Sequence, residues 1–386
     1  METTTEKPRR EAPLYIPVRR AYRSRHSEVD WDNLELGTYT SDHMLVCDYA
    51  EGGWQQPEIM PFGPFVLSPT TLALHYGQTI FEGMKAFRTE DGRIHIFRPE
   101  RHYERLLRSA ERLCMPVPAS GVFVEGLRRL VQLEKDWVPG QAGTALYLRP
   151  MIIATDTRLS IKIADSYRFA IVCLPAGPYF GSALRVKVER RWVRAVRGGT
   201  GSAKCGGNYG GALYPTQQAK DEGYDQVLWT DGLQHRYVEE MGMMNVFFVI
   251  DGVLVTPPLT DTILDGVTRD SLLTLALSAG ITVAERPVSV EELREGLERG
   301  RVREAFGAGT AAVVSPIRSI GIDGQEYALP VAGADLGAAG ETASAAGGAH
   351  NEAGGSIALF LKAELNAIRY GQKPDPYGWN NYIPAE

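Results

Sequence analysis

The chain has 386 residues, 44% of them hydrophobic and 23% charged, and a formal net charge of −6 at pH 7. Such a length and composition are typical of a globular protein with two or three domains and a large core. The negative charge argues against wholesale binding of nucleic acid, and no apolar run approaches the roughly 20 residues that span a bilayer. We therefore expect neither a nucleic-acid partner nor a membrane partner.

The N-terminal segment and the cysteines bear on the compartment. The first 25 residues contain acidic residues and lack an apolar core, which is not typical of a signal peptide. The four cysteines are widely spaced: Cys47, Cys114, Cys173 and Cys205. They form no CxxC pair and no cluster of metal ligands. The sequence thus predicts a reduced, cytoplasmic setting and no metal site.

The first half of the chain is expected to combine strands with two helices. Residues 1–60 are polar and punctuated by Pro and Gly, which predicts an arm and leading strands. Asp91-Gly92 interrupts short apolar runs, which is a hairpin signal. Apolar residues at helical spacing after Pro99 predict a helix. The remaining expected elements are a second helix and two buried strands: 122–137, 146–153 and 167–174.

The second half is expected to mix strands with helices. The expected strands are 226–230, 245–250 and 311–315, and the expected helices are 214–222, 269–279, 290–299 and 357–369. Residues 331–355 consist mostly of Ala, Gly, Ser, Thr, Glu and Asp. Such a composition cannot bury a core, so this segment is expected to be a mobile insertion.

One lysine stands in a glycine-rich setting: Gly198 to Tyr209 reads Gly-Gly-Thr-Gly-Ser-Ala-Lys-Cys-Gly-Gly-Asn-Tyr. Glycines let the backbone approach a ligand closely, and a desolvated lysine amine can act as a nucleophile that forms a Schiff base. A flexible surface loop with a solvated Lys204 is the alternative. The segment is not a P-loop, because Cys205 and not Ser or Thr follows the lysine, and it is not a dinucleotide fingerprint.

This segment resembles the lysine motif of branched-chain aminotransferases, which are fold-type IV enzymes of pyridoxal phosphate (PLP). Further stretches resemble the same family in the same order: 75–87, 97–100, 104–106, 108–113, 146–150, 177–180, 238–245, 263–269 and 306–311. The resemblance runs from about Leu74 to Ile317. One such motif is weak evidence, whereas an ordered set of this size is strong.

The resemblance implies an α+β, two-domain enzyme with mixed sheets and flanking helices, which we expect to form a homodimer. The expected parts are an arm with leading strands, a small α/β domain, an interdomain connection and a large PLP-binding domain: 1–60, 61–178, 179–190 and 191–386. The implied activity is reversible amino transfer between L-leucine, L-isoleucine or L-valine and 2-oxoglutarate, by a ping-pong cycle through pyridoxamine phosphate.

PLP chemistry needs a Schiff-base lysine and an acidic partner for the pyridine nitrogen, since protonation there strengthens the ring as an electron sink. The resemblance assigns these roles to Lys204 and Glu240, and it gives Tyr209 a hydrogen bond to the ring oxygen. Taken alone, Glu240 and its neighbour Glu239 could equally be solvated residues of a strand or loop.

The cofactor phosphate calls for backbone N–H groups at a helix start, hydroxyls and a guanidinium. Gly266 and Val267 offer N–H groups before an expected helix, and Thr268 adds a hydroxyl. Thr310 supplies a hydroxyl in a second turn. The resemblance makes Arg105 the cation, although a solvated helix arginine is the usual fate of such a residue.

The resemblance also maps a substrate pocket onto aromatic residues, any of which could instead be plain core: Tyr76, Phe81, Tyr147 and Tyr179. Arg149 is the matching arginine for the γ-carboxylate of glutamate. The N–H groups of the turn formed by Thr310 and Ala311 are expected to bind the α-carboxylate.

The sequence departs from the family at Met243, where some members carry Thr, and at Leu159-Ser160-Ile161, where a Leu-Gly-Val loop is common and reaches the neighbouring subunit's site. D-amino-acid aminotransferases and aminodeoxychorismate lyases are rival activities within the same fold. A non-catalytic binding protein on this fold and a nucleotide-binding oxidoreductase are rivals from other classes.

Overall fold

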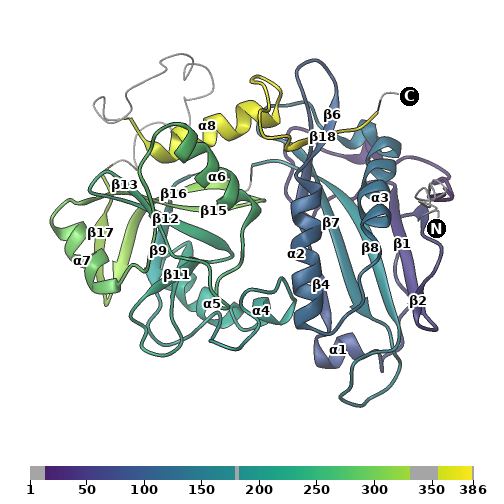
Figure 1. Cartoon of the computed structure of the whole chain (residues 1–386), viewed down its shortest axis with the longest axis horizontal. Helices are drawn as coiled ribbons and strands as arrows, with labels where there is room; N and C mark the ends of the chain where they lie inside the picture. Colours follow the sequence, from purple (N-terminus) through teal and green to yellow (C-terminus); the bar gives the residue numbers. More distant parts are fainter. Residues whose placement is uncertain (1–13, 179–181, 331–354, 385–386) are drawn as a thin grey trace, which may run out of the picture.

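The computed structural model describes residues 14–178, 182–330 and 355–384. Two nine-stranded sheets form the two halves of the molecule, and helices cover them. In Figure 1 the sheet drawn in purple and blue stands on the right, the green sheet stands on the left, and α2 (Pro99–Arg112) lies between them. The α+β class with mixed sheets is therefore confirmed.

The first sheet has the strand order β18-β6-β5-β7-β8-β1-β2, with β3 paired to β1 and β4 paired to β7. Its strands are β1 (His43–Ala50), β2 (Gly53–Trp54), β3 (Glu58–Pro61), β4 (Thr79–Phe81), β5 (Met84–Arg88), β6 (Ile94–Phe97), β7 (Ala145–Ala154), β8 (Tyr167–Ala176) and β18 (Asn380–Tyr382). All its pairings are antiparallel. The two strands expected at 146–153 and 167–174 and the hairpin at Asp91-Gly92 are confirmed.

The second sheet has the order β11-β10-β9-β16-β15-β12-β13-β14, with β17 paired to β16, and it mixes parallel with antiparallel pairs. Its strands are β9 (Leu184–Val188), β10 (Gln226–Thr230), β11 (Val238–Met241), β12 (Met244–Ile250), β13 (Val253–Thr256), β14 (Val283–Glu285), β15 (Val302–Gly309), β16 (Val313–Ile322) and β17 (Gln325–Ala328). The β12 strand is buried throughout, as expected of a strand covered on both faces.

Eight α-helices are described. They are α1 (Leu72–Tyr76), α2, α3 (Ser120–Leu133), α4 (Gly207–Gly210), α5 (Leu213–Asp221), α6 (Val267–Ser278), α7 (Val290–Glu298) and α8 (Ile357–Arg369), with short 3-10 turns at His26–Glu28 and Lys135–Trp137. Helices α2, α3, α6, α7 and α8 contribute apolar residues to the cores beside the sheets. Pro99 stands at the first position of α2, and Ser289 and Ser356 cap α7 and α8 through their hydroxyls.

The sequence predicts the bounds of the helices well and those of one strand poorly. The helix expected after Pro99 and the helix expected at 357–369 are confirmed. The strand expected at 311–315 is wrong at its start, because β15 ends at Gly309 and β16 begins only at Val313, whose φ of 62° closes the turn between them. An apolar run alone does not show where a tight turn lies within it.

The expected domain limits stay a prediction. The expected connection at 179–190 includes β9, which lies inside the second sheet, and β18 near the C-terminus pairs with β6 of the first sheet. The expected insertion at 331–355 lies almost wholly outside the described residues. Among the helices that the structure describes, none combines the length and the apolar character needed to cross a membrane.

Candidate active site

The backbone of Lys204 is fixed at the seam between the two halves. Its N–H donates to Oγ of Ser109 on α2 at 2.8 Å, and its carbonyl accepts from the N–H of Phe81 on β4 at 3.0 Å. An isolated bridge between Ile80 and Cys205 continues this pairing. The alternative of a freely solvated surface loop therefore does not hold for Lys204.

The amine of Lys204 points into a small aromatic cluster. Its Nζ lies 3.0 Å from the hydroxyl of Tyr209, which α4 carries, and 4.8 Å from the centre of the Phe81 ring. The Phe81 and Tyr209 rings lie 5.1 Å apart. The lysine, the tyrosine and the phenylalanine named from the sequence are thus brought together.

A guanidinium also lies against Phe81. The Arg149 guanidinium lies 4.8 Å from the centre of the Phe81 ring, and its Nη2 donates to the Tyr147 hydroxyl at 3.1 Å. Its Nε is buried without a hydrogen-bond partner. Gly83 makes room for this pair, because a Cβ there would lie 1.9 Å from the Tyr147 hydroxyl. Arg149 therefore keeps donor capacity for an added carboxylate.

Glu240 on β11 is a buried carboxylate held by a cation and two amides. Its Oε2 lies 2.8 Å from Nε of Arg194, and its Oε1 accepts from the backbone N–H of Leu264 at 2.9 Å and from Asn245 at 3.3 Å. Burial raises the pKa of Glu240, while Arg194 opposes the rise, as do Lys204 and Arg105 more weakly. Glu240 is therefore electrostatically coupled to the lysine.

The neighbouring Glu239 has different surroundings. Its Oε1 accepts from the Thr262 hydroxyl at 2.6 Å, and its Oε2 is buried without a partner. Burial raises the pKa of Glu239 to about 7, and the bond from Thr262 opposes this rise. Of the two carboxyls, Glu240 is the one whose pKa responds to Lys204 and Arg105. Glu240 is thus the member of this pair whose charge interacts with the lysine.

Arg105 lies in α2 with its guanidinium buried against Glu82. Its Nε and Nη2 donate to the two oxygens of Glu82 at 2.8 and 2.7 Å, and its Nη1 donates to the carbonyl of Asp265 at 2.9 Å. Burial alone would raise the pKa of Glu82, but Arg105 and His102 hold it well below its usual range. Burial also lowers the pKa of His102, to about 4, so the imidazole is neutral at pH 7. Arg105 is not the solvated helix arginine of the alternative.

The first turn of α6 lies directly beside Arg105, because Asp265 precedes Gly266, the N-cap of this helix. The N–H groups at a helix start, here those of Val267 and Thr268, have no carbonyl partner within the helix and attract anions. Gly266 is required, since a Cβ would lie 1.9 Å from Oδ1 of Asn245. Both Val267 and Thr268 are buried. A guanidinium and a helix start therefore lie side by side, an arrangement that suits an anion.

The turn between β15 and β16 carries Thr310 and Ala311, both half-buried. Nζ of Lys85, a buried residue of β5, donates to the carbonyl of Ala311 at 2.9 Å. Burial, with a smaller effect of Arg369, lowers the pKa of Lys85 to about 7. Because Lys85 pairs with Tyr147 across the first sheet, the turn is held close to the Arg149 cluster.

Two of the expected pocket residues are not joined to this cluster. Tyr76 ends α1 with 44% of its surface exposed, and no contact recorded for the described residues links it to Lys204. Tyr179 lies outside the described residues.

Three of the positions at which the sequence departs from the family are exposed. Met243 is exposed in the turn between β11 and β12, and Leu159 and Ile161 are exposed in the loop between β7 and β8.

Four contributors were missed from the sequence: Glu82, Lys85, Arg194 and Asp265. Glu82 and Lys85 stand inside a stretch that shares its pattern with the family, so their place there was a usable signal. Arg194 belongs to a basic run at 190–197 that looks like a solvated surface, and nothing local marks its ion pair with Glu240. Asp265 also stands inside such a stretch, 263–269, but no local pattern indicates its partners, which lie more than 150 residues away.

The donor set fits pyridoxal phosphate. It combines an amine beside a phenol, a buried carboxylate coupled to that amine, an anion site formed by a helix start and a guanidinium, and the orphaned Nε of Arg149. No described group of His, Cys, Asp and Glu residues is arranged to hold a metal ion.

Comparison with known structures agrees with this fold. The structure resembles a branched-chain aminotransferase from Thermoproteus uzoniensis with norvaline, with a TM-score of 0.69, 25% identity and coverage of 89% of this chain and 100% of the other. It also resembles the branched-chain amino acid aminotransferase of Escherichia coli, with a TM-score of 0.68, 25% identity and coverage of 89% and 99%. A third similar structure, a branched-chain amino acid aminotransferase from T.th., contains pyridoxamine 5′-phosphate, with a TM-score of 0.68, 25% identity and coverage of 88% and 98%. The architecture is that of the fold-type IV PLP enzymes, as predicted.

Sequence comparison then defines the family. Residues 79–320 match the family of amino-transferase class IV. The chain is 48% identical over 301 residues to branched-chain-amino-acid transaminase 1 of Bacillus subtilis (strain 168), an alignment that covers 77% of this chain and 85% of the relative. This chain belongs to the class IV aminotransferases and is a PLP-dependent enzyme.

Proposed function

We propose that the protein is a branched-chain L-amino acid aminotransferase, which transfers the amino group of leucine, isoleucine or valine to 2-oxoglutarate in a ping-pong cycle. The observation that carries the proposal is the cluster of Lys204, Tyr209, Phe81 and Arg149, which sets an amine, an apolar ring and an uncommitted guanidinium side by side. The names of the relatives agree with this substrate class.

The chain's own residues divide the task of holding the cofactor. Lys204 would bind it through Nζ, and Glu240 would pair with its pyridine nitrogen. The phosphate would be held by Arg105, by the start of α6 and by the turn between β15 and β16, through Gly266, Val267, Thr268 and Thr310. When bound, PLP withdraws electrons from Cα of the amino acid and stores the amino group between the half-reactions.

Lys204 and Tyr209 carry the proton chemistry. Once the substrate amine has replaced it on the cofactor, the free Nζ of Lys204 would take the proton from Cα of the substrate and deliver it to the cofactor, as a positioned general base and then acid. The Tyr209 hydroxyl, at 3.0 Å, orients the amine. Arg194 and the Leu264 N–H keep Glu240 in place and favour its ionised form against the effect of burial.

The substrate site must accept an apolar side chain and a carboxylate in turn. Phe81 and Tyr147 offer the apolar surface, and Arg149 offers donors to the γ-carboxylate of glutamate. The turn of Thr310 and Ala311 offers N–H groups to the α-carboxylate, and Lys85 steadies that turn.

We also propose that a second copy of the chain completes the pocket. The loop between β7 and β8 exposes Leu159 at 59%, Ile161 at 88% and Ile163 at 57%, and Tyr76 is half-exposed in α1. Such a group of exposed apolar residues is typical of an interface. A homodimer explains why Tyr76 has no recorded contact with the Lys204 cluster of its own chain.

The test is a coupled assay that starts the reaction with L-leucine, L-isoleucine, L-valine, D-alanine or aminodeoxychorismate. We expect turnover with the three L-amino acids and 2-oxoglutarate, and none in the matched Lys204→Ala variant. Turnover with D-alanine or aminodeoxychorismate alone would assign the chain to a rival activity of the same fold. Turnover retained in Lys204→Ala would contradict the assignment of the catalytic lysine.

A further inference from the structure

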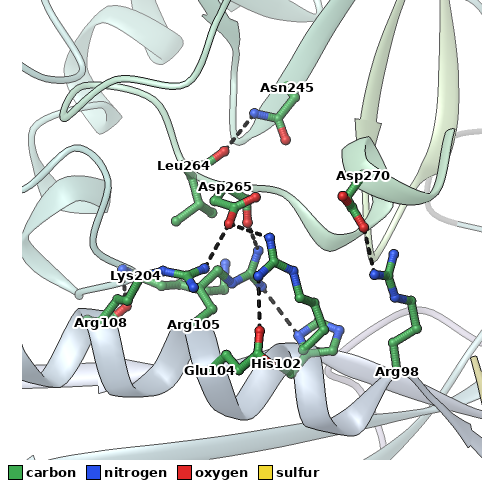
Figure 2. Close-up of polar contacts among 12 residues, drawn as sticks. Arg98, His102, Glu104, Arg105, Arg108, Lys204, Asn245, Leu264, Asp265 and Asp270 are labelled. Carbon is green, nitrogen blue, oxygen red and sulfur yellow. Dashed lines mark hydrogen bonds and ion pairs between the residues drawn. The ribbon is translucent and has the colours of Figure 1, made fainter. Parts of the chain in front are cut away.

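Three arginines of α2 meet at a single residue of the opposite half, Asp265. Its Oδ2 accepts from Nη2 of Arg101 and from Nη2 of Arg108, both at 2.8 Å, and its carbonyl accepts from Arg105 at 2.9 Å. Figure 2 shows Asp265 above α2, with the side chains of Arg105 and Arg108 rising toward it. All three contacts act on the residue directly before the N-cap of α6.

The same loop is anchored from the other side by the second sheet. Nδ2 of Asn245 donates to the carbonyl of Leu264 at 2.9 Å (Figure 2). The Leu264 N–H donates to Glu240 at 2.9 Å. The loop at 264–266 is thus held between the carboxylate of Glu240 and the arginines of α2. Asp265 is the residue of this loop that the arginines of α2 contact.

We propose that Asp265 is a positioning residue for the phosphate end of the cofactor. Its carboxylate fastens the start of α6 to Arg101 and Arg108, so that the N–H groups of Val267 and Thr268 stay next to the Arg105 guanidinium. This inference rests on the proposed function, since it concerns the phosphate site of the bound cofactor.

Arg105 itself does not depend on the Asp265 carboxylate. Its two bonds to Glu82 are parallel and bidentate, which fixes the guanidinium plane from within the first half. Removal of the Asp265 side chain therefore releases the loop from Arg101 and Arg108 and leaves the Arg105 guanidinium in place. A change in phosphate affinity in such a variant therefore reflects a change in the position of the start of α6.

The negative charge of Asp265 and its role in positioning the loop predict opposite effects of its removal on phosphate binding. A carboxylate next to an anion site repels the anion, so its removal strengthens binding if charge alone matters. Loss of the two charge-assisted bonds that hold the loop weakens binding if position matters. Because Asp265 is already paired with two guanidinium groups, we expect the positional effect to dominate.

The experiment measures the dissociation constants of PLP and of pyridoxal, which lacks the phosphate, for the apo forms of the wild type, Asp265→Asn and Asp265→Ala. We expect both variants to bind PLP on the order of tenfold more weakly, and pyridoxal as the wild type does. The matched control is Asp48→Asn, which removes a carboxylate of β1 that accepts two bonds from Arg168 at 2.7 and 2.9 Å, away from the loop at 264–266. This control should keep the PLP affinity of the wild type.

Unchanged or tighter PLP binding by the Asp265 variants would overturn the inference, and so would an equal loss for pyridoxal and PLP. If Asp265→Ala fails to fold, the isosteric Asp265→Asn decides. A wild-type protein that does not bind PLP at all would instead contradict the proposed function.

Discussion

At the scale of single residues, the two adjacent glutamates of β11 differ in what surrounds them. Glu240 is paired with Arg194 and coupled to Lys204, whereas Glu239 bonds Thr262. Both carboxyls are buried and both pKa values are raised. Contacts therefore distinguish Glu240, the candidate site residue, from Glu239, whereas burial does not.

This difference gives the first prediction. Glu240→Gln should retain the cofactor but lower kcat by about 100-fold, because a neutral amide no longer favours the protonated pyridine nitrogen. Steady-state kinetics measures kcat, and the visible absorption of the purified variant measures cofactor retention. Glu239→Gln is the control and should keep kcat within about threefold. Equal losses in the two variants would show that the loss comes from burial and not from the ring nitrogen.

A second prediction concerns Arg149, whose Nε has no partner among the described residues. Arg149→Met should raise KM for 2-oxoglutarate by about 10- to 100-fold, as expected for the loss of charged hydrogen bonds to a carboxylate. The KM for L-leucine should change far less, because its side chain needs only apolar surface. An equal rise in both KM values would contradict the role of Arg149 in binding the γ-carboxylate.

At the scale of elements, β6 and α8 are joined by a buried imidazole. Nε2 of His95 on β6 donates to the carbonyl of Arg369 at the end of α8 at 2.6 Å. Burial lowers the pKa of His95 from 6.5 to about 4. Between these two pH values the unfolded chain binds a proton that the folded chain does not, so the stability falls as the pH falls.

The third prediction follows from this contact. Acidification from pH 6.5 to 4.5 should lower the free energy of unfolding of the wild type more than that of His95→Gln, by up to about 1.4 kcal/mol per pH unit. Urea unfolding at several pH values measures this difference. Glutamine can donate to the same carbonyl but does not titrate. If the free energy of unfolding of the two proteins fell equally with falling pH, His95 would not be the group responsible.

The elements also show what the sequence could predict. The helix beginning at Pro99 and the strand at 226–230 follow from local spacing, and the structure has them. The start of β16 was wrong because the turn before it is set by Val313 at positive φ, which no local pattern announces. Helical spacing marks a buried face, but it does not tell which polar residues of the other face find partners.

At the scale of the whole molecule, the site exists only where the two halves meet. Lys204 and Tyr209 come from the second half, while Phe81, Arg149 and Arg105 come from the first (Figure 1). The family resemblance named these residues because it carries their roles along the chain. It did not give their partners, such as Asp265 for Arg101, because a contact across 164 residues leaves no local trace.

The fourth prediction concerns assembly. Ile161→Asp should shift the protein from dimer to monomer and lower turnover, because it places a charge in the exposed apolar loop between β7 and β8. Light scattering during size-exclusion chromatography measures the mass. Leu233→Asp is the control, since Leu233 is similarly exposed, at 75%, but lies in the turn between β10 and β11 of the second half. A wild type that is monomeric and active would contradict a shared pocket.

The cytoplasmic location stays a prediction.

The central claim is that one lysine-linked cofactor serves both half-reactions, and an absorption titration of the purified protein tests it most directly. We expect a visible cofactor band that disappears on addition of L-leucine and returns on addition of 2-oxoglutarate. A band that ignores L-leucine but responds to D-alanine would contradict the proposed substrate class. The absence of any band after addition of PLP would contradict the account as a whole.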